Sequence, residues 1–157
     1  MSVTLEHAAD LLQYVGRPLG TSDLVVLDQA RIDAFAALTG DDHWIHVDVE
    51  RAAREMPQGK TIVHGFLVLS LIPFLQRSVY AIRQRGKALN YGCNRVRFTS
   101  PVPVGSRVRL RQGVKECERI ESSAPPSTRI SFECAIEIEG QERPALVAET
   151  ILQIFDR

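Results

Sequence analysis

The hydrophobic pattern of this chain changes its period near residue 88, and this change limits the folds that it can adopt. Before that point, a run from Gly65 to about Ile82 is apolar on nearly every face, which predicts a helix buried in the middle of the fold and kinked or divided at Pro73. After it, apolar and polar residues alternate, most regularly from Ile130 to Ile138, as in half-buried strands. Further strands are expected at residues 94–98, 107–111 and 146–155, with turns at 101–105, 125–126 and 140.

The first third of the chain predicts shorter elements. Helices are expected at residues 3–15, 29–38 and 49–56, with a short strand at 24–27. Asp28 and Asp48 are candidate N-caps, and Gly40 suits the left-handed position that ends a helix. Helices, then a buried central helix, then long antiparallel strands predict an α+β fold in which a curved sheet wraps around that helix. No repeat or linker divides the sequence, so one domain over residues 1–157 is expected.

Charge and cysteine content narrow the classes of function. The 157 residues carry 19 basic and 19 acidic side chains, so a formal net charge of zero predicts no general attraction to nucleic acid or an anionic membrane. Three scattered cysteines without a CxxC motif predict reduced thiols and a cytoplasmic protein. The N-terminus lacks the basic region of a signal peptide, and the apolar stretch from Ile62 to Leu75 is too short to span a bilayer.

The segment from Thr39 to His46 holds the densest group of titratable side chains. Asp41 and His46 follow a predicted helix end, which can project both into a cleft. A carboxylate and an imidazole that lie close together can hold one water molecule, one group taking its proton and the other donating. The ordinary alternative is that Asp41 is a turn residue and His46 a hydrogen-bonded polar residue with no catalytic role. Asp42 is expected to face solvent.

A second pair, His64-Gly65, opens the apolar helix. The first N–H groups of a helix have no acceptor within it, and they carry the positive end of its dipole. A glycine there lets a ligand approach the backbone, so the Gly65 N–H could stabilise the charge that develops on a thioester oxygen. The alternative is a glycine selected for close helix packing.

The two motifs together resemble a known family. Phe35-Ala-Ala-Leu-Thr-Gly-Asp41-x-x-x-Ile-His46, followed by Ile62-Val-His64-Gly65-Phe66, is similar to the signature of the MaoC-like (R)-specific enoyl-CoA hydratases, also called hydratase 2, which have a hot-dog fold. The segments at 44–48 and 90–98 resemble the nodulation protein N-like dehydratase branch. The resemblance implies that Asp41 and His46 activate water, that the Gly65 N–H is the oxyanion donor, and that an acyl-CoA substrate binds near the interface of a homodimer without a cofactor.

His43 and Trp44 depart from the family pattern, which has Asn-Pro at these positions. The departure affects the expected substrate range more than the reaction type. The expected substrate-binding residues are His43, Trp44, His64 and Phe66. Trp44 could line the acyl or pantetheine channel, although a buried packing role is an equal alternative.

Other chemistries remain as alternatives. A metal site built from Asp41, His43, His46 and Asp48 lacks a helix to place its ligands, and no metal is expected. No GxSxG motif marks a covalent nucleophile, and no glycine-rich phosphate loop is present. Arginines at 95, 97, 107, 109 and 111 could contact CoA phosphates, but a solvated strand face is favoured. The rival functions are a hot-dog thioesterase and a non-catalytic acyl-CoA-binding or accessory subunit.

Overall fold

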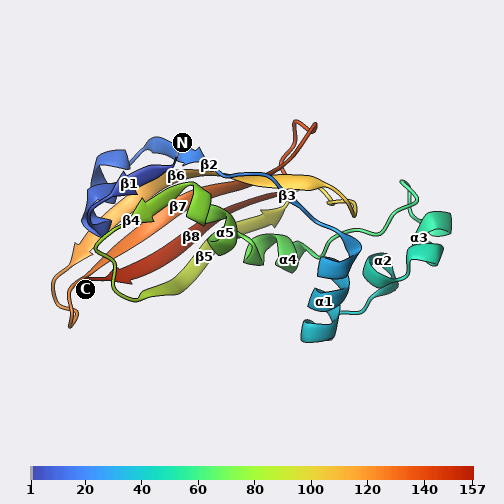
Figure 1. Cartoon of the computed structure of the whole chain (residues 1–157), viewed down its shortest axis with the longest axis horizontal. Coiled ribbons are helices and arrows are strands. Elements are labelled where there is room, and N and C mark those ends of the chain that lie inside the picture. The colour runs from blue at the N-terminus through green and yellow to red at the C-terminus, as the bar shows by residue number, and fades with distance from the viewer. Residues whose placement is uncertain (1) are drawn as a thin grey trace.

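A computed structural model describes residues 2–157 and shows a long curved sheet with helices along one side and beyond one end (Figure 1). The sheet has six strands, with β2, β6, β7, β8 and β5 side by side in that order and β3 also paired with β6. Every pairing within this sheet is antiparallel. The strand bounds are β2 Arg17–Thr21, β3 Val25–Val26, β5 Ala88–Phe98, β6 Arg107–Ile120, β7 Ser127–Ile138 and β8 Leu146–Phe155. The predicted α+β class is confirmed.

Strand β7 confirms the alternation on which the sheet was predicted. Ile130, Phe132 and Ile136 have no exposed surface, and they point into the core together with Val108 and Leu110 of β6. Alternate residues on the other face are at least partly exposed, except Ser127 and Ala135, which are buried. One face of the sheet is therefore apolar and packs on the helices, as period-two patterning requires.

The N-terminal segment differs from the prediction. Residues 3–15, expected as one helix, form strand β1 (Val3–Leu5) and the 3-10 helix η1 (Ala8–Tyr14). Strand β1 pairs in parallel with β4 (Tyr80–Ile82), and this long-range pairing draws the first residues out of the helix that their local spacing favours. Leu5, Ala8 and Leu11 are buried all the same, so the apolar positions were identified correctly.

The central apolar segment is shorter and less enclosed than expected. It forms α4 (Gly65–Ser70), α5 (Ile72–Leu75) and the 3-10 helix η2 (Gln76–Ser78), and ends before β4 begins. Leu67, Val68 and Ile72 pack into the core. Phe66 and Phe74, however, are 67% and 48% exposed, so the prediction of burial on every face was wrong.

The exposed side of this segment lies beside an exposed edge of the sheet. Strand β5 is the last strand in the sheet order, and nearly all of its residues are exposed, among them Leu89, Tyr91 and Phe98. Phe66 of α4 meets Phe98 of β5 edge to face, with ring centres 5.5 Å apart. An uncovered strand edge next to exposed aromatic side chains is unusual for a protein surface without a partner.

Three helices, α1 (Gln29–Thr39), α2 (Trp44–Val47) and α3 (Val49–Glu55), project beyond one end of the sheet (Figure 1). The predicted caps are confirmed, because the Asp28 carboxylate accepts from the Arg31 N–H at 3.0 Å and the Asp48 carboxylate from the Arg51 N–H at 2.9 Å. Gly40 ends α1 with φ +78°, a left-handed conformation that favours glycine. This turn reverses the chain between α1 and α2.

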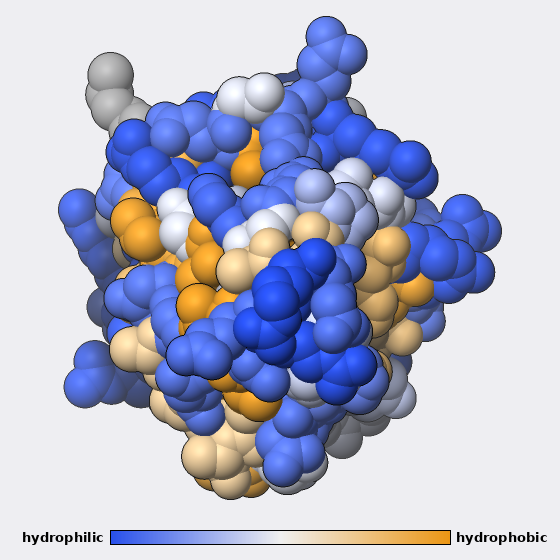
Figure 2. Space-filling model, turned by 90° about the vertical axis from the view of Figure 1, so that its right-hand side faces the viewer, coloured by the Kyte–Doolittle hydropathy of each residue, from blue (hydrophilic) through white to orange (hydrophobic). Residues whose placement is uncertain are grey.

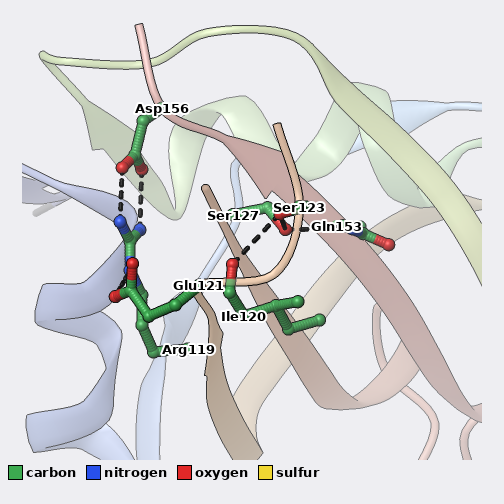
Figure 3. A network of polar contacts seen from close by, with 7 residues as sticks. All are labelled: Arg119, Ile120, Glu121, Ser123, Ser127, Gln153 and Asp156. Carbon is green, nitrogen blue, oxygen red and sulfur yellow. Dashed lines mark hydrogen bonds and ion pairs between the residues drawn. The ribbon is translucent and has the colours of Figure 1, made fainter. Parts of the chain in front are cut away.

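The opposite end of the sheet is closed by a polar network (Figure 3). Arg119, near the end of β6, donates to Asp156 beside the C-terminus at 2.8 Å and to Glu121 at 2.8 Å. Ser127 at the start of β7 joins Ser123 and Gln153. Within residues 2–157 no helix combines the length and apolarity needed to cross a bilayer.

Candidate active site

The predicted water-activating pair lies where the α1–α2 turn meets the start of α4. Asp41 follows the left-handed turn at Gly40 and is exposed, whereas His46 in α2 is 9% exposed. Together with His64, they bring one carboxylate and two imidazoles within 4.8 Å of one another. Residues 23 positions apart in the sequence therefore meet at one place. Seen from this end of the molecule, the surface is mainly hydrophilic with smaller apolar patches (Figure 2).

A backbone hydrogen bond fixes the orientation of the His46 ring. Its Nδ1 lies 2.7 Å from the carbonyl oxygen of Ile62. A carbonyl oxygen only accepts, so Nδ1 carries the hydrogen and the neutral ring has an unprotonated Nε2. Burial lowers the pKa of His46, an effect partly opposed by the Ile62 hydrogen bond. His46 is therefore held as a base, and within residues 2–157 its Nε2 accepts no hydrogen bond.

A pocket of about 390 Å³ opens beside His46 and Gly65. Its walls come from the segment before α4, from α4 itself, and from the end of β5 with the loop that follows. The lining is mainly apolar and includes Phe66, Phe98 and Val102. A Cβ atom on Gly65 would lie only 2.9–3.1 Å from the Phe98 ring, so a side chain at this position would displace that ring. The glycine therefore lets the Phe98 ring pack closely against the start of the helix, which is the packing role considered above as the alternative.

Gln29 holds this part of the fold together. Its Nε2 donates to the carbonyl oxygen of His46 at 2.8 Å, and its Oε1 accepts from the hydroxyl of Thr61 at 2.6 Å. Ile62 N–H also donates to the carbonyl of Ile45 at 3.0 Å. These bonds tie α1, α2 and the segment before α4 into one unit. No sequence motif marked Gln29, Thr61 or Phe98, because their roles depend on contacts between distant segments.

The residues expected to bind substrate occupy different positions. Phe66 lines the pocket, and His64 is buried below it, with its Nε2 2.8 Å from the carbonyl oxygen of Asp41. His43 is exposed at the start of α2, and Trp44 is half-buried beneath the guanidinium of Arg51, 4.2 Å from the ring centre. Asp42 is exposed, as expected. The structure thus brings Asp41 to His46 and His64, and it places His46, Gly65 and Phe66 on one pocket, whose lining does not include Asp41. His43 and Trp44 lie outside this lining.

The geometry of the two imidazoles favours hydrogen bonding over metal chelation. The rings of His46 and His64 are stacked, with centres 3.8 Å apart and planes inclined by 24°. Lone pairs in nearly parallel ring planes do not converge on one ion, and one nitrogen of each ring already contacts a carbonyl oxygen. Asp48, considered as a ligand from the sequence, instead caps α3.

The arginines of β6 that were considered as phosphate contacts, at positions 107, 109 and 111, all form ion pairs. Ion pairs to β7 or to the residue that follows it are formed by Arg107 with Glu139 at 3.0 Å, Arg109 with Glu137 at 2.9 Å and Arg111 with Glu137 at 2.8 Å. This pattern agrees with the favoured interpretation of a solvated strand face.

Comparison with known protein families shows to which family the chain belongs. The model of the MaoC like domain matches residues 10–129. The chain belongs to the MaoC-like family. Over 150 residues this MaoC-like chain is 44% identical to 3-hydroxyacyl-thioester dehydratase Z of Mycobacterium tuberculosis, covering 96% of this chain and 97% of that protein. It is 47% identical over 151 residues to nodulation protein N of Rhizobium leguminosarum bv. viciae, covering 94% and 91%.

Solved structures confirm the hot-dog architecture of this MaoC-like protein. The R-hydratase PhaJ1 from Pseudomonas aeruginosa superposes with a TM-score of 0.68 at 21% identity, covering 90% of this chain and 81% of that one. The (R)-hydratase from A. caviae gives a TM-score of 0.64 at 23% identity, covering 85% and 92%. At this level of identity the similarity concerns the fold. The resemblance to the MaoC-like family and its nodulation protein N-like branch is thereby confirmed.

Proposed function

We propose that this MaoC-like protein is a hydro-lyase that adds water to trans-2-enoyl-CoA, giving (R)-3-hydroxyacyl-CoA, and catalyses the reverse dehydration. The observation that carries the proposal is a base with a free nitrogen, His46, in the same pocket as the start of α4. The dehydratase from M. tuberculosis, similar over nearly the whole of both chains, supports a 3-hydroxyacyl thioester as the substrate class.

In the proposed mechanism, Asp41 and His46 hold one water molecule against Cβ of the substrate. The water oxygen bonds to Cβ as its proton passes to Nε2 of His46, the atom left free by the hydrogen bond from Nδ1 to Ile62. Negative charge moves to the thioester oxygen, where the N–H of Gly65 donates, because the first residue of a helix has no intrahelical acceptor. The imidazolium of His46 then returns its proton to Cα, which completes the addition of one water molecule and restores the neutral base.

The apolar lining of the pocket supports an acyl substrate. Phe66 and Phe98 can exclude bulk water from the enoyl group, which strengthens the hydrogen bonds made to the developing charge. His43 and Trp44 remain predicted contributors to substrate binding, whereas His64 is buried and does not line the pocket. Trp44 is the first residue of α2 and His43 is its N-cap residue, and both stand at the positions that depart from the family pattern.

A spectrophotometric assay tests the proposed reaction. Purified protein is mixed with crotonyl-CoA and longer enoyl-CoAs, and the loss of enoyl absorbance is followed together with the release of free thiol. Hydration without thiol release is expected. Thiol release without hydration would instead identify a thioesterase, in which water attacks the carbonyl carbon, and no turnover would favour a binding subunit.

We also propose that the protein is a homodimer in the cytoplasm. Within residues 2–157, no strand pairs with the outer edge of β5, and exposed Leu89, Tyr91 and Phe98 lie along it. A second copy would cover this edge and the adjacent Phe66. Light scattering after size-exclusion chromatography should give twice the mass of 17.5 kDa, and Tyr91→Lys should shift the protein toward monomer. The three cysteines are free thiols, in keeping with the proposed location.

A further inference from the structure

His64 is enclosed by two rings beneath the pocket. The imidazole of His46 is stacked on one side at 3.8 Å, and the ring of Phe35 from α1 lies 4.9 Å away with a tilt of 52°. Only 2% of His64 is exposed, and the residue is not among those that line the pocket. Direct contact with substrate is therefore a poor description of what this side chain does.

The hydrogen bond of His64 determines where its proton lies. Its Nε2 is 2.8 Å from the carbonyl oxygen of Asp41, which only accepts, so Nε2 carries the hydrogen. Nδ1 of the neutral ring is then unprotonated, and within residues 2–157 it has no hydrogen-bond partner although it is buried. Nδ1 of His64 is thus an acceptor without a donor, and the Nε2–H of the ring donates to the carbonyl oxygen of Asp41.

We propose that His64 is a positioning residue that holds the two members of the water-activating pair in register. Its Nε2–H fixes the backbone of Asp41, an exposed turn residue, while its ring face fixes the plane of the His46 imidazole. One side chain therefore sets the distance between the carboxylate and the base. This inference rests on the proposed function of Asp41 and His46.

The stack also affects the charge of His46. Three titratable groups face it: His64 from below, Asp41 from the α1–α2 turn and His43 from the start of α2. Asp41 raises the pKa of His46, whereas the two imidazoles lower it, with His64 contributing more than His43. A cation stacked against a second imidazole in a buried site is disfavoured. His64 thereby helps to keep His46 in the form that accepts a proton.

Two substitutions separate the hydrogen bond from the stack. His64→Gln retains an N–H donor for the Asp41 carbonyl and removes the ring. His64→Phe retains a ring against His46 and removes the donor. His7→Gln, an exposed histidine substitution outside the pocket, is the matched control. Each variant is compared with the wild type by thermal unfolding, by kcat and KM across pH, and by NMR of the histidine rings.

The two variants should fail in different ways. His64→Phe should lower kcat about ten- to a hundredfold with KM little changed, because a misplaced catalytic group costs rate more than binding. His64→Gln should lower kcat less than His64→Phe, because the hydrogen bond from Nδ1 to Ile62 still orients the His46 ring, and it should move the acidic limb of the kcat/KM profile to higher pH. Equal losses in both variants, or a change in KM alone, would overturn the proposal in favour of packing or substrate contact.

NMR of the substrate-free protein tests the positioning role of His64 independently of turnover. In the wild type, the nitrogen shifts should show His64 protonated at Nε2 and unprotonated at Nδ1. The carbonyl carbon shift of Asp41 should change in His64→Phe and remain close to wild type in His64→Gln. A His64 protonated at Nδ1 in the neutral wild type, or an Asp41 shift indifferent to both variants, refutes the role. If the wild type hydrates no enoyl-CoA, the proposed function fails while these shifts still decide whether His64 positions Asp41.

Discussion

The two ends of the sheet use polar side chains in opposite ways. At the end formed by the β6–β7 hairpin, charged and hydroxyl groups bind one another: Arg119 to Asp156 and Ser123 to Ser127 (Figure 3). At the end that carries α1–α3, His46 and His64 are each held by a backbone carbonyl instead. Pairing side chain with side chain uses up both functional groups. Anchoring one nitrogen of a ring to the backbone leaves the other free for chemistry.

The two ends also differ in how much stability is lost when one polar partner is removed. The ion pairs at the hairpin end are exposed, where such contacts contribute little and are screened by salt. At the site end, buried Thr61, His46 and His64 depend on a few specific acceptors. Loss of one partner there leaves a buried polar group unsatisfied, which is the more expensive event. The hairpin end should therefore tolerate substitution, and the site end should not.

The largest expected effect is the loss of either member of the water-activating pair. Asp41→Asn and His46→Gln should each lower kcat by at least about a hundredfold, the usual scale for a general acid or base. Measurement of enoyl-CoA hydration with each variant checks this, and Asp42→Asn, an exposed neighbour, is the matched control. Rates close to those of the wild type would remove these residues from the mechanism.

A smaller loss is expected when Gly65 gains a side chain. The new Cβ in Gly65→Ala would press on the Phe98 ring at 2.9–3.1 Å, so the ring and the helix start must separate. A displacement of this size should lower kcat about ten- to a hundredfold. The double variant with Phe98→Leu should recover much of the loss, because a smaller side chain leaves room for the methyl group. Failure to recover would show that the N–H of Gly65, and not the contact with Phe98, is what the alanine disturbs.

Local signals explain why much of the fold was predictable from the sequence. In β7 the alternation of apolar and polar residues follows the alternation of buried and more exposed positions. The helix caps at Asp28 and Asp48 are bonds to residues only three positions away, so they can be predicted from the local sequence. The failures involve distant partners. Residues 3–5 and 80–82 have helical local patterns, and only their pairing with each other makes them strands.

The same distinction applies to the site. Asp41, His46 and Gly65 belong to compact motifs, so sequence and family resemblance identified them as candidates. The stacking of His46 on His64 and the bridge from Gln29 to Thr61 join segments 18 and 32 positions apart. No local pattern records such contacts. The exposure of Phe66 was missed because hydropathy describes a side chain without saying which faces of the fold remain uncovered.

Removal of the Gln29 bridge should reduce stability as well as activity. Gln29→Met keeps the length of the side chain but leaves the buried Thr61 hydroxyl without its acceptor and the His46 carbonyl without its donor. The free energy of unfolding should fall by about 1–3 kcal/mol, as for other unsatisfied buried groups. Urea denaturation measures it, and the double variant with Thr61→Val should be less destabilised than the sum of the single variants. A strictly additive result would show that the two side chains are not coupled.

The lowered pKa of His46 gives a pH dependence with a definite sign. Burial is its main cause, so the folded protein binds a proton to this ring less readily than the unfolded chain, whose histidine pKa is about 6.5. The contribution to stability is complete above that value and is lost as the pH falls through the lower folded-state pKa. The acidic limb of kcat/KM should likewise lie below pH 6.5. His46→Gln should weaken the decline of stability below that pH, and an unchanged decline would assign it to other groups.

The smallest effect is expected at the hairpin end. The hydrogen bonds from Arg119 hold the pKa of Asp156 below its usual range, so this carboxylate stabilises the fold above the unfolded-state value of about 3.9 and ceases to do so as the pH falls through its lower folded-state pKa. Because Arg119 is a surface residue, Arg119→Met should leave kcat and KM unchanged and should lower the melting temperature slightly, less so at high salt. Thermal unfolding at low and high ionic strength checks this. A large, salt-independent loss would mean that the hairpin end depends on specific pairing as strongly as the site end does, and the contrast between the two ends would fail.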